Sequence, residues 1–223
     1  WKVKAKTIDY LVNTHLHPDH LQGLLFLLRN FPVNRVWSNG EGNGDLALTE
    51  EFFGLVPEEW QKMGRGEAPK EISGVSVEFL HPPLGKKKGQ SFQGNDASLV
   101  IKLTYGEIRF LLAGDVEAPA EEEILGAKSD LRSTVLKAPH HGSKTSSTPQ
   151  FVEKVRPEFV VFTVKAGGRQ RLPHPTVLER YERIGGKVFR TDRDGAITFI
   201  TDGKNLRVQT FLGNQCMGIA KAF

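Results

Sequence analysis

The feature that most constrains this chain is the string His15-Leu16-His17-Pro18-Asp19-His20, which gathers three of the seven histidines and an aspartate. A strand-like run at 8–12 precedes the string, and apolar residues at helical spacing follow it at 21–29. We therefore expect a loop that joins a strand to a helix. Neutral imidazoles and a carboxylate are ligands that a borderline divalent cation prefers. His15, His17, Asp19 and His20 are thus predicted metal ligands.

The rest of the chain alternates between strand-like and helix-like patterns. Strands are expected at 33–37, 75–80, 98–105, 108–113, 134–136, 159–163, 187–189, 196–201 and 206–211, and helices at 49–63, 151–155 and 176–184. This alternation predicts the α/β class. The length of 223 residues suits a single domain spanning 1–223.

The composition excludes some kinds of metal ligand, but it does not identify a substrate. The one cysteine, Cys216, excludes an internal disulfide and a cysteine metal cluster, so metal ligands must be His, Asp, Glu or Asn. A net charge of +4 suits an anionic substrate but is also common in proteins that bind none. The apolar stretch 24–28 is too short to span a bilayer, and we expect no targeting segment in this chain. The chain begins with Trp1, as a piece of a longer protein would.

The histidine string resembles the signature of the metallo-β-lactamase superfamily, whose fold is an αββα sandwich. Short motifs further along the chain resemble those of ComEC-like proteins of bacterial DNA uptake and occur in the same order. These motifs are Asn95-Asp96-Ala97-Ser98, His140-His141-Gly142-Ser143, Pro173-His174-Pro175, Arg190-Thr191-Asp192 and Gly195-Ala196-Ile197. The resemblance covers about 8–201. Only fourteen residues precede His15, so we expect the first half-sheet to be truncated.

The resemblance implies a centre of two divalent ions, zinc or manganese. Asp115, after an apolar strand, is expected to bridge the ions, and His140 is the favoured ligand of the next pair of histidines. His141 is either a partner of a ligand or a substrate contact. Asn95 stands where relatives place an imidazole, and its amide oxygen favours a harder ion such as Mn²⁺ over Zn²⁺.

The same resemblance suggests catalytic and substrate-binding roles. Asp19 is expected to orient the attacking water, and His174 or His141 to protonate the leaving oxygen. The residues expected to grip substrate phosphates are Ser143, Lys144, Lys137, Arg169 and Arg171. Lys86, Lys87 and Lys88 form either a solvated loop or a further contact with the phosphate backbone.

The function that the resemblance implies is a metal-dependent nuclease that degrades one DNA strand during natural transformation. Its partners would be DNA, single-stranded above all, and the membrane channel of the same parent protein, with no lipid contact by this chain. Its place would be the extracytoplasmic face of a bacterial inner membrane; without a ComEC-like parent we expect a soluble protein. One alternative is hydrolysis of a phosphorylcholine ester, thioester or lactam. Another is a non-catalytic domain that binds single-stranded DNA. Metal content and nuclease activity separate these classes, because a fold does not fix a substrate.

Overall fold

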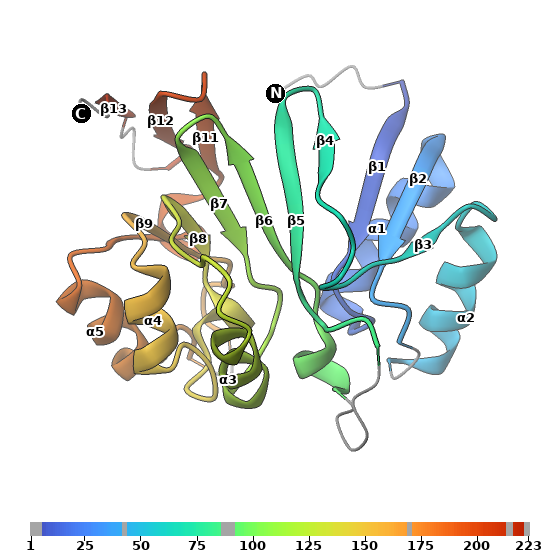
Figure 1. Cartoon of the computed structure of the whole chain (residues 1–223), viewed down its shortest axis with the longest axis horizontal. Helices are drawn as coiled ribbons and strands as arrows, with labels where there is room; N and C mark the ends of the chain where they lie inside the picture. Colours follow the sequence, from blue (N-terminus) through green and yellow to red (C-terminus); the bar gives the residue numbers. More distant parts are fainter. Residues whose placement is uncertain (1–5, 42–43, 86–91, 169–170, 213–215, 221–223) are drawn as a thin grey trace.

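The computed structural model describes residues 6–41, 44–85, 92–168, 171–212 and 216–220. Two β-sheets face each other in its centre, and helices cover their outer sides (Figure 1). The first sheet has the order β1 (Ile8–Asn13), β2 (Val33–Ser38) and β3 (Gln61–Lys62), all parallel. Helices α1 (Pro18–Asn30) and α2 (Leu46–Leu55) lie on this side. This arrangement is the predicted αββα sandwich.

The second sheet is larger and mixes parallel with antiparallel pairing. Its order is β10 (Lys187–Arg190), β9 (Phe159–Phe162), β8 (Val135–Lys137), β7 (Ile108–Leu112), β6 (Val100–Tyr105), β5 (Val75–His81) and β4 (Lys70–Ile72). Strands β7 to β10 are parallel, and β4 to β7 are antiparallel. The covering helices are α3 (Ala118–Gly126), α4 (Pro149–Val155) and α5 (Pro175–Arg183). None of the helices in the described ranges is long and apolar enough to cross a membrane.

A third sheet follows the short helix α6 (Thr191–Asp194). It consists of β11 (Ile197–Thr201), β12 (Asn205–Thr210) and β13 (Cys216–Ala220), paired antiparallel. Leu206 and Val208 of this sheet pack against Ile108, Phe159 and Phe189 of the seven-stranded sheet. The parallel half of the large sheet is therefore buried on both faces.

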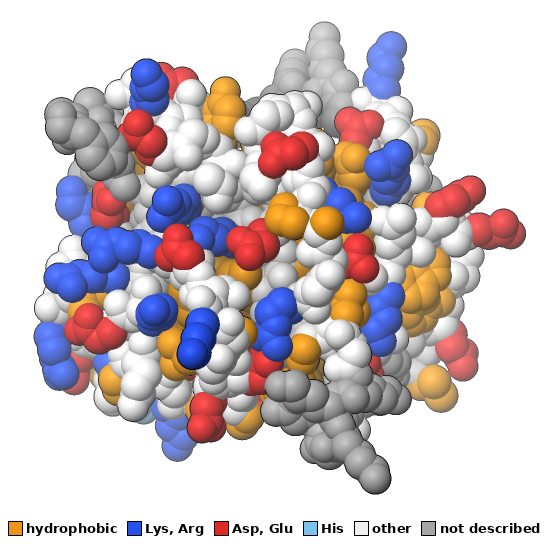
Figure 2. Space-filling view, in the orientation of Figure 1, with side chains coloured by type: hydrophobic (Ala, Val, Ile, Leu, Met, Phe, Trp, Pro, Cys, Tyr) orange, Lys and Arg blue, Asp and Glu red, His pale blue; other side chains and the backbone are white. Residues whose placement is uncertain are grey.

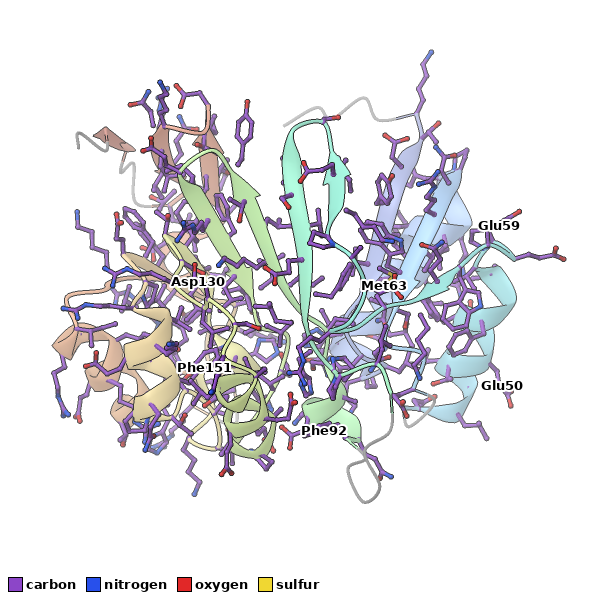
Figure 3. All side chains as sticks on the ribbon, viewed as in Figure 1. Glu50, Glu59, Met63, Phe92, Asp130 and Phe151 are labelled. Atoms are coloured by element: carbon purple, nitrogen blue, oxygen red, sulfur yellow. The ribbon has the colours of Figure 1, made fainter. Side chains whose placement is uncertain are left out.

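The cores follow the layers. Trp37, Met63 and Phe79 are almost fully buried in the cluster that joins the two central sheets, where Figure 3 places Met63. Phe52 packs with the apolar face of α1 on the first sheet, and Phe151 packs in the cluster of the second sheet and its helices. Complete burial of such side chains contributes about 1.5–3 kcal/mol each.

One predicted helix is wrong in its bounds. The expected helix at 49–63 is α2 at Leu46–Leu55, after which Gln61–Lys62 joins the first sheet as β3. The Asp45 carboxylate caps the helix by accepting from the Leu48 backbone N–H at 3.0 Å. The helix ends before Pro57, because proline disfavours helical backbone in the residue that precedes it. Helix α3 was not predicted.

Strand direction brings the candidate residues to one edge. Parallel strands β7 and β8 have their carboxyl ends together, and the start of antiparallel β6 lies beside the end of β7. The Leu99 N–H donates to the Thr14 carbonyl at 2.9 Å, which joins the end of β1 to the start of β6. Segments 14–20, 94–98, 113–115 and 138–142 therefore meet.

Candidate metal centre

The predicted loop of histidines is shorter than expected, because α1 already begins at Pro18. Proline suits the first helical position, where its fixed φ is helical and its missing N–H has no partner to lose. His17 is the N-cap, so His15 and His17 lie in the loop. Asp19 and His20 lie in the first turn of the helix, where they project toward the second sheet.

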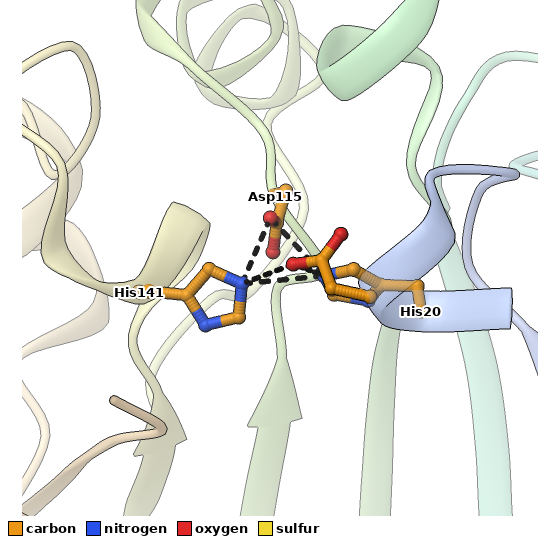
Figure 4. A group of neighbouring side chains, drawn as sticks. His20, Asp115 and His141 are labelled. Atoms are coloured by element: carbon orange, nitrogen blue, oxygen red, sulfur yellow. Dashed lines mark hydrogen bonds and ion pairs between the residues drawn. The ribbon is translucent and has the colours of Figure 1, made fainter. Parts of the chain in front are cut away.

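Four side chains from three segments converge in this region: Asp19, His20, Asp115 and His141. One ligand atom from each lies within 4.8 Å of the others. His20 Nε2 is 3.1 Å from Asp115 Oδ2 and 3.7 Å from Asp19 Oδ2. His141 Nε2 is 3.2 Å from the same Asp115 oxygen, 3.3 Å from Asp19 Oδ2 and 3.4 Å from His20 Nε2 (Figure 4). We call this set the four-donor group.

The four-donor group fits a divalent cation in both chemistry and spacing. Two imidazole nitrogens and two carboxylate oxygens are ligands of zinc and related ions. Donors held about 2.0–2.2 Å from an ion in a tetrahedron stand roughly 3.3–3.6 Å apart. The distances of 3.1–3.7 Å match this spacing.

Asp115 is the buried centre of the group, with a side chain only 3% exposed. Burial alone would raise the pKa of its carboxyl, but the ring nitrogens of His141 and His20 together with Lys137 hold that pKa well below its usual range. Asp115 is therefore ionised at neutral pH, as a ligand must be.

The placement of Lys137 differs from the prediction that it grips substrate phosphates. Its Nζ donates to the Gly114 carbonyl at 3.1 Å and to Asp115 Oδ1 at 3.3 Å. Burial lowers the pKa of this ammonium group. Lys137 thus holds one oxygen of Asp115 and leaves Oδ2 to face the two histidines.

His140 was the favoured ligand, but the structure places His141 in the four-donor group. His141 Nδ1 donates to the Thr163 carbonyl at 2.8 Å, which leaves the Nε2 lone pair directed at the four-donor group. His140 turns away, with its Nδ1 at 2.9 Å from Glu117 Oε1. Both residues have left-handed backbone, with φ of 44° and 52°, an unusual conformation for residues other than glycine. This bend sends neighbouring rings in different directions.

Gly142 allows the bend after these histidines to pack closely. A Cβ at this position would lie 2.6 Å from Pro173 Cβ and 2.7 Å from the Phe162 ring, and its φ is +83°. The backbone can therefore approach β9 and the cis Leu172-Pro173 turn only if residue 142 is glycine.

A second set of donors lies beside the first. His15 is 1% exposed, and its Nε2 is buried without a hydrogen-bond partner. Burial lowers the pKa of His15 to about 3, so its ring is neutral at pH 7. The His17 ring lies 4.6 Å from the His15 ring, and Asn95 Oδ1 is also buried without a partner. Orphaned buried acceptors are rare, and all three side chains fit a second cation.

A small cavity marks the same place. It has a volume of about 10 Å³, close to the volume that one water molecule needs, and it is lined in part by His15, His17, Gly94 and Ala97. Gly94 and Ala97 bound the short helical turn that carries Asn95.

Neither Asp96 nor Ser98 takes the place expected of Asn95. Asp96 Oδ1 instead accepts from the Glu117 N–H at 2.8 Å. Ser98 Oγ lies 3.2 Å from His15 Nδ1 and accepts from the Asp115 N–H at 3.1 Å. Ser98 therefore holds one residue of each donor set, a role that sequence analysis did not assign.

Ser98→Ala is expected to lower divalent-metal affinity about 10- to 100-fold, the usual effect of removing a group that orients ligands. The variant loses the contact that fixes the His15 ring and leaves the buried Asp115 N–H without its acceptor. Titration with Zn²⁺ against a competing chelator measures the change. Ser76→Ala on β5 is the control, and wild-type affinity in a folded Ser98→Ala protein would contradict the assignment.

The remaining predicted residues are spread around the centre. His174 is the N-cap of α5, where its Nδ1 accepts from the Thr176 backbone N–H at 3.3 Å. The backbone N–H of His174 donates to the Gly142 carbonyl at 2.9 Å. Ser143 Oγ bonds Thr145 Oγ1 at 2.8 Å, and Lys144 is exposed beside it. Arg169 and the lysines at 86–88 lie outside the described residues. Arg171 lines a pocket that reaches the four-donor group.

Two further residues support the site without any sequence signal beyond their position near a strand end. Thr163, just after β9, accepts from His141 through both its carbonyl and its hydroxyl oxygen. His81, at the end of β5, binds the Asp96 carbonyl at 2.7 Å and Glu123 at 3.2 Å, which fixes the turn carrying Asn95.

Comparisons with known proteins agree with this geometry. The sequence profile described as the metallo-beta-lactamase superfamily matches residues 1–163. ComE operon protein 3 of Bacillus subtilis is 27% identical over 197 residues, which is 87% of this chain and 25% of that protein. Competence protein ComA of Neisseria gonorrhoeae is 30% identical over 198 residues, 87% of this chain and 26% of that protein. The chain therefore spans about a quarter of the length of these relatives.

A solved structure extends the comparison to the fold. The metallo-beta-lactamase fold protein YhfI from Bacillus subtilis is 12% identical, with a TM-score of 0.50 over 85% of this chain and 77% of that one. At this identity the likeness concerns the fold and not the substrate.

Proposed function

Because this chain belongs to the metallo-β-lactamase superfamily, we propose that it is a divalent-metal-dependent phosphodiesterase that cuts DNA during its uptake by a bacterium. The four-donor group carries this proposal, because it supplies ligands of the right kind at the spacing of a metal site. The relative that bears the name of a competence protein supports DNA as the substrate. A domain that only binds DNA would not need such a group.

The residues divide the chemical work. Bound divalent ions polarise a phosphoryl oxygen and lower the pKa of water toward neutrality. The four-donor group would hold one ion, and His15, His17 and Asn95 would hold a second; Zn²⁺ and Mn²⁺ are the candidates. Asp19, whose side chain is 63% exposed, accepts a hydrogen bond from the attacking water and orients it.

His174 is suited to protonate the leaving oxygen. Its Nδ1 accepts from the Thr176 N–H, so its proton resides on Nε2, where it can be donated. The backbone bond from His174 to Gly142 places the His174 backbone beside the residue that follows His141.

The setting we propose follows the competence relatives. The domain would act on single-stranded DNA at the extracytoplasmic face of the inner membrane, together with the channel part of a longer parent protein and without touching lipid. Figure 2 shows lysine and arginine side chains gathered mainly over the half of the visible face that carries the large sheet and its helices. Such a surface favours encounter with an anionic polymer.

Cleavage of end-labelled single- and double-stranded DNA with Zn²⁺ or Mn²⁺ tests the function. We expect cleavage that a chelator abolishes and that added metal restores. Binding without cleavage under every metal condition would overturn the proposal in favour of a binding domain. Hydrolysis of a thioester, lactam or phosphorylcholine ester without cleavage of DNA would replace it with another hydrolase.

Asn95→His is expected to raise Zn²⁺ affinity and to reduce the dependence of cleavage on Mn²⁺. An imidazole nitrogen is a better ligand for zinc than an amide oxygen, and it would complete a set with His15 and His17. Titration of wild type and variant with each ion, while cleavage is followed, measures both effects. Identical metal preference in the two proteins would show that Asn95 is not a ligand position.

A further inference from the structure

A pocket of about 490 Å³ opens directly beside the four-donor group. Asp19 and His141 line it on the side of that group, and its remaining lining comes from the segment after β9. These lining residues are Thr163, Val164, Lys165, Gly168, Arg171 and Leu172. Thr163 also holds the His141 ring, so the wall of the pocket and the metal centre share one support.

Two cations stand in the pocket without acidic partners. Lys165 and Arg171 are exposed, and no carboxylate in the described ranges pairs with either of them. Arg65 and Arg190, by contrast, are paired with Glu123 and Asp192. Unpaired cations in a concave site attract an anion.

The backbone of the segment brings the two cations together. The Gly168 N–H donates to the Lys165 carbonyl at 3.3 Å, and the Arg171 N–H donates to the Gly168 carbonyl at 3.1 Å. These bonds fold the segment back, so that both side chains line the same pocket.

Two side chains of the wall are nonpolar. Val164 and Leu172 are half-buried, and Gly168 leaves the backbone open to a flat ligand. Nonpolar surface next to two cations fits a nucleobase attached to a sugar and a phosphate. A lactam offers no such combination of a flat ring and a repeated phosphate charge.

The volume of the pocket favours a single DNA strand over a duplex. The volume lies in the range of about 300–1,000 Å³ that is typical of sites for small ligands, which suits one nucleotide unit. A base in a duplex could enter only after leaving its stack, at a cost of about a few kcal/mol. The pocket therefore favours a single strand or a strand end.

We infer that this pocket binds one nucleotide unit of a single DNA strand next to the scissile phosphate. The base lies against Val164 and Leu172, and Lys165 with Arg171 holds the neighbouring backbone phosphates. The inference rests on the proposed function and adds the residues that hold the single strand, which they recognise by shape and charge and not by base identity.

Binding of a fluorescent 12-nucleotide oligothymidylate, measured by anisotropy in chelator, tests the pocket apart from cleavage. The double variant Lys165→Ala/Arg171→Ala should bind about 10-fold more weakly at 0.15 M salt. The slope of log affinity against log salt should become shallower by about 1.4, which is roughly 0.7 for each lost phosphate contact on a single strand. Leu172→Glu should weaken binding without loss of a cation.

The matched control is Lys154→Ala/Arg183→Ala, which removes the same charge from exposed positions on α4 and α5. It should bind as the wild type does. Equal affinity and equal slope for wild type and the pocket variant would overturn the inference, as would tighter binding of a matched duplex. Failure of the wild type to cut DNA would count against the proposed function alone, because binding in chelator does not depend on it.

Discussion

His141→Ala is expected to remove divalent metal from the four-donor group and to lower DNA cleavage by more than about 100-fold. Loss of a group that merely orients a ligand costs about 10- to 100-fold, and His141 supplies a donor atom itself. Its Nε2 lies 3.2 Å from Asp115 and 3.3 Å from Asp19, so no neighbour can replace it without rearrangement. Elemental analysis and cleavage rates measure the two effects.

His140→Ala is the matched control for this variant. It removes an adjacent imidazole with the same left-handed backbone, but one that faces Glu117. We expect metal content to stay at the wild-type level and cleavage to fall by at most about 10-fold. A larger loss with His140→Ala than with His141→Ala would show that the two rings have been assigned the wrong way round.

Asp19→Ala is expected to lower cleavage by at least about 10²-fold, because the change removes both a donor of the four-donor group and the carboxylate that orients the attacking water. Single-stranded DNA binding should remain within about 3-fold, because the change removes an acidic group from the pocket and leaves both cations in place. The side chain is 63% exposed, so the fold should not depend on it.

Glu50→Ala serves as the control for the loss of an exposed carboxylate. Glu50 lies on α2, on the outer side of the first sheet (Figure 3). This variant should bind and cut as the wild type does. If Asp19→Ala lost binding and cleavage in equal measure, its carboxylate would be organising the pocket and not the attacking water.

The chemistry of the centre could be predicted from the sequence because its ligands are clustered along the chain. His15, His17, Asp19 and His20 fall within one string, and the pattern around them indicates a strand end. The structure brings Asp19 and His20 of this string together with Asp115, which follows the apolar strand β7. The α/β class follows from the alternation of strand and helix patterns, and the αββα sandwich was predicted from the family resemblance of the histidine string.

Helix bounds were predicted less well from the sequence where apolar spacing and a proline favoured different bounds. The apolar residues between 49 and 63 fit one long helix, but the preference of the residue before Pro57 for extended backbone ended it at Leu55. Asp19 and His20 are helical because Pro18 starts α1 earlier than the apolar spacing indicates.

What the sequence by itself determined is therefore the types of donor residue, the α/β class and the edge at which the strands end, because periodicity and ligand type are local properties. Only the tertiary structure decided between His140 and His141, since two neighbouring left-handed residues turn adjacent rings apart. It also directed Lys137 to Asp115 and placed residues of 163–168 and 171–172 in one pocket wall. These outcomes depend on which strands lie side by side, and contacts between distant segments leave no period in the sequence.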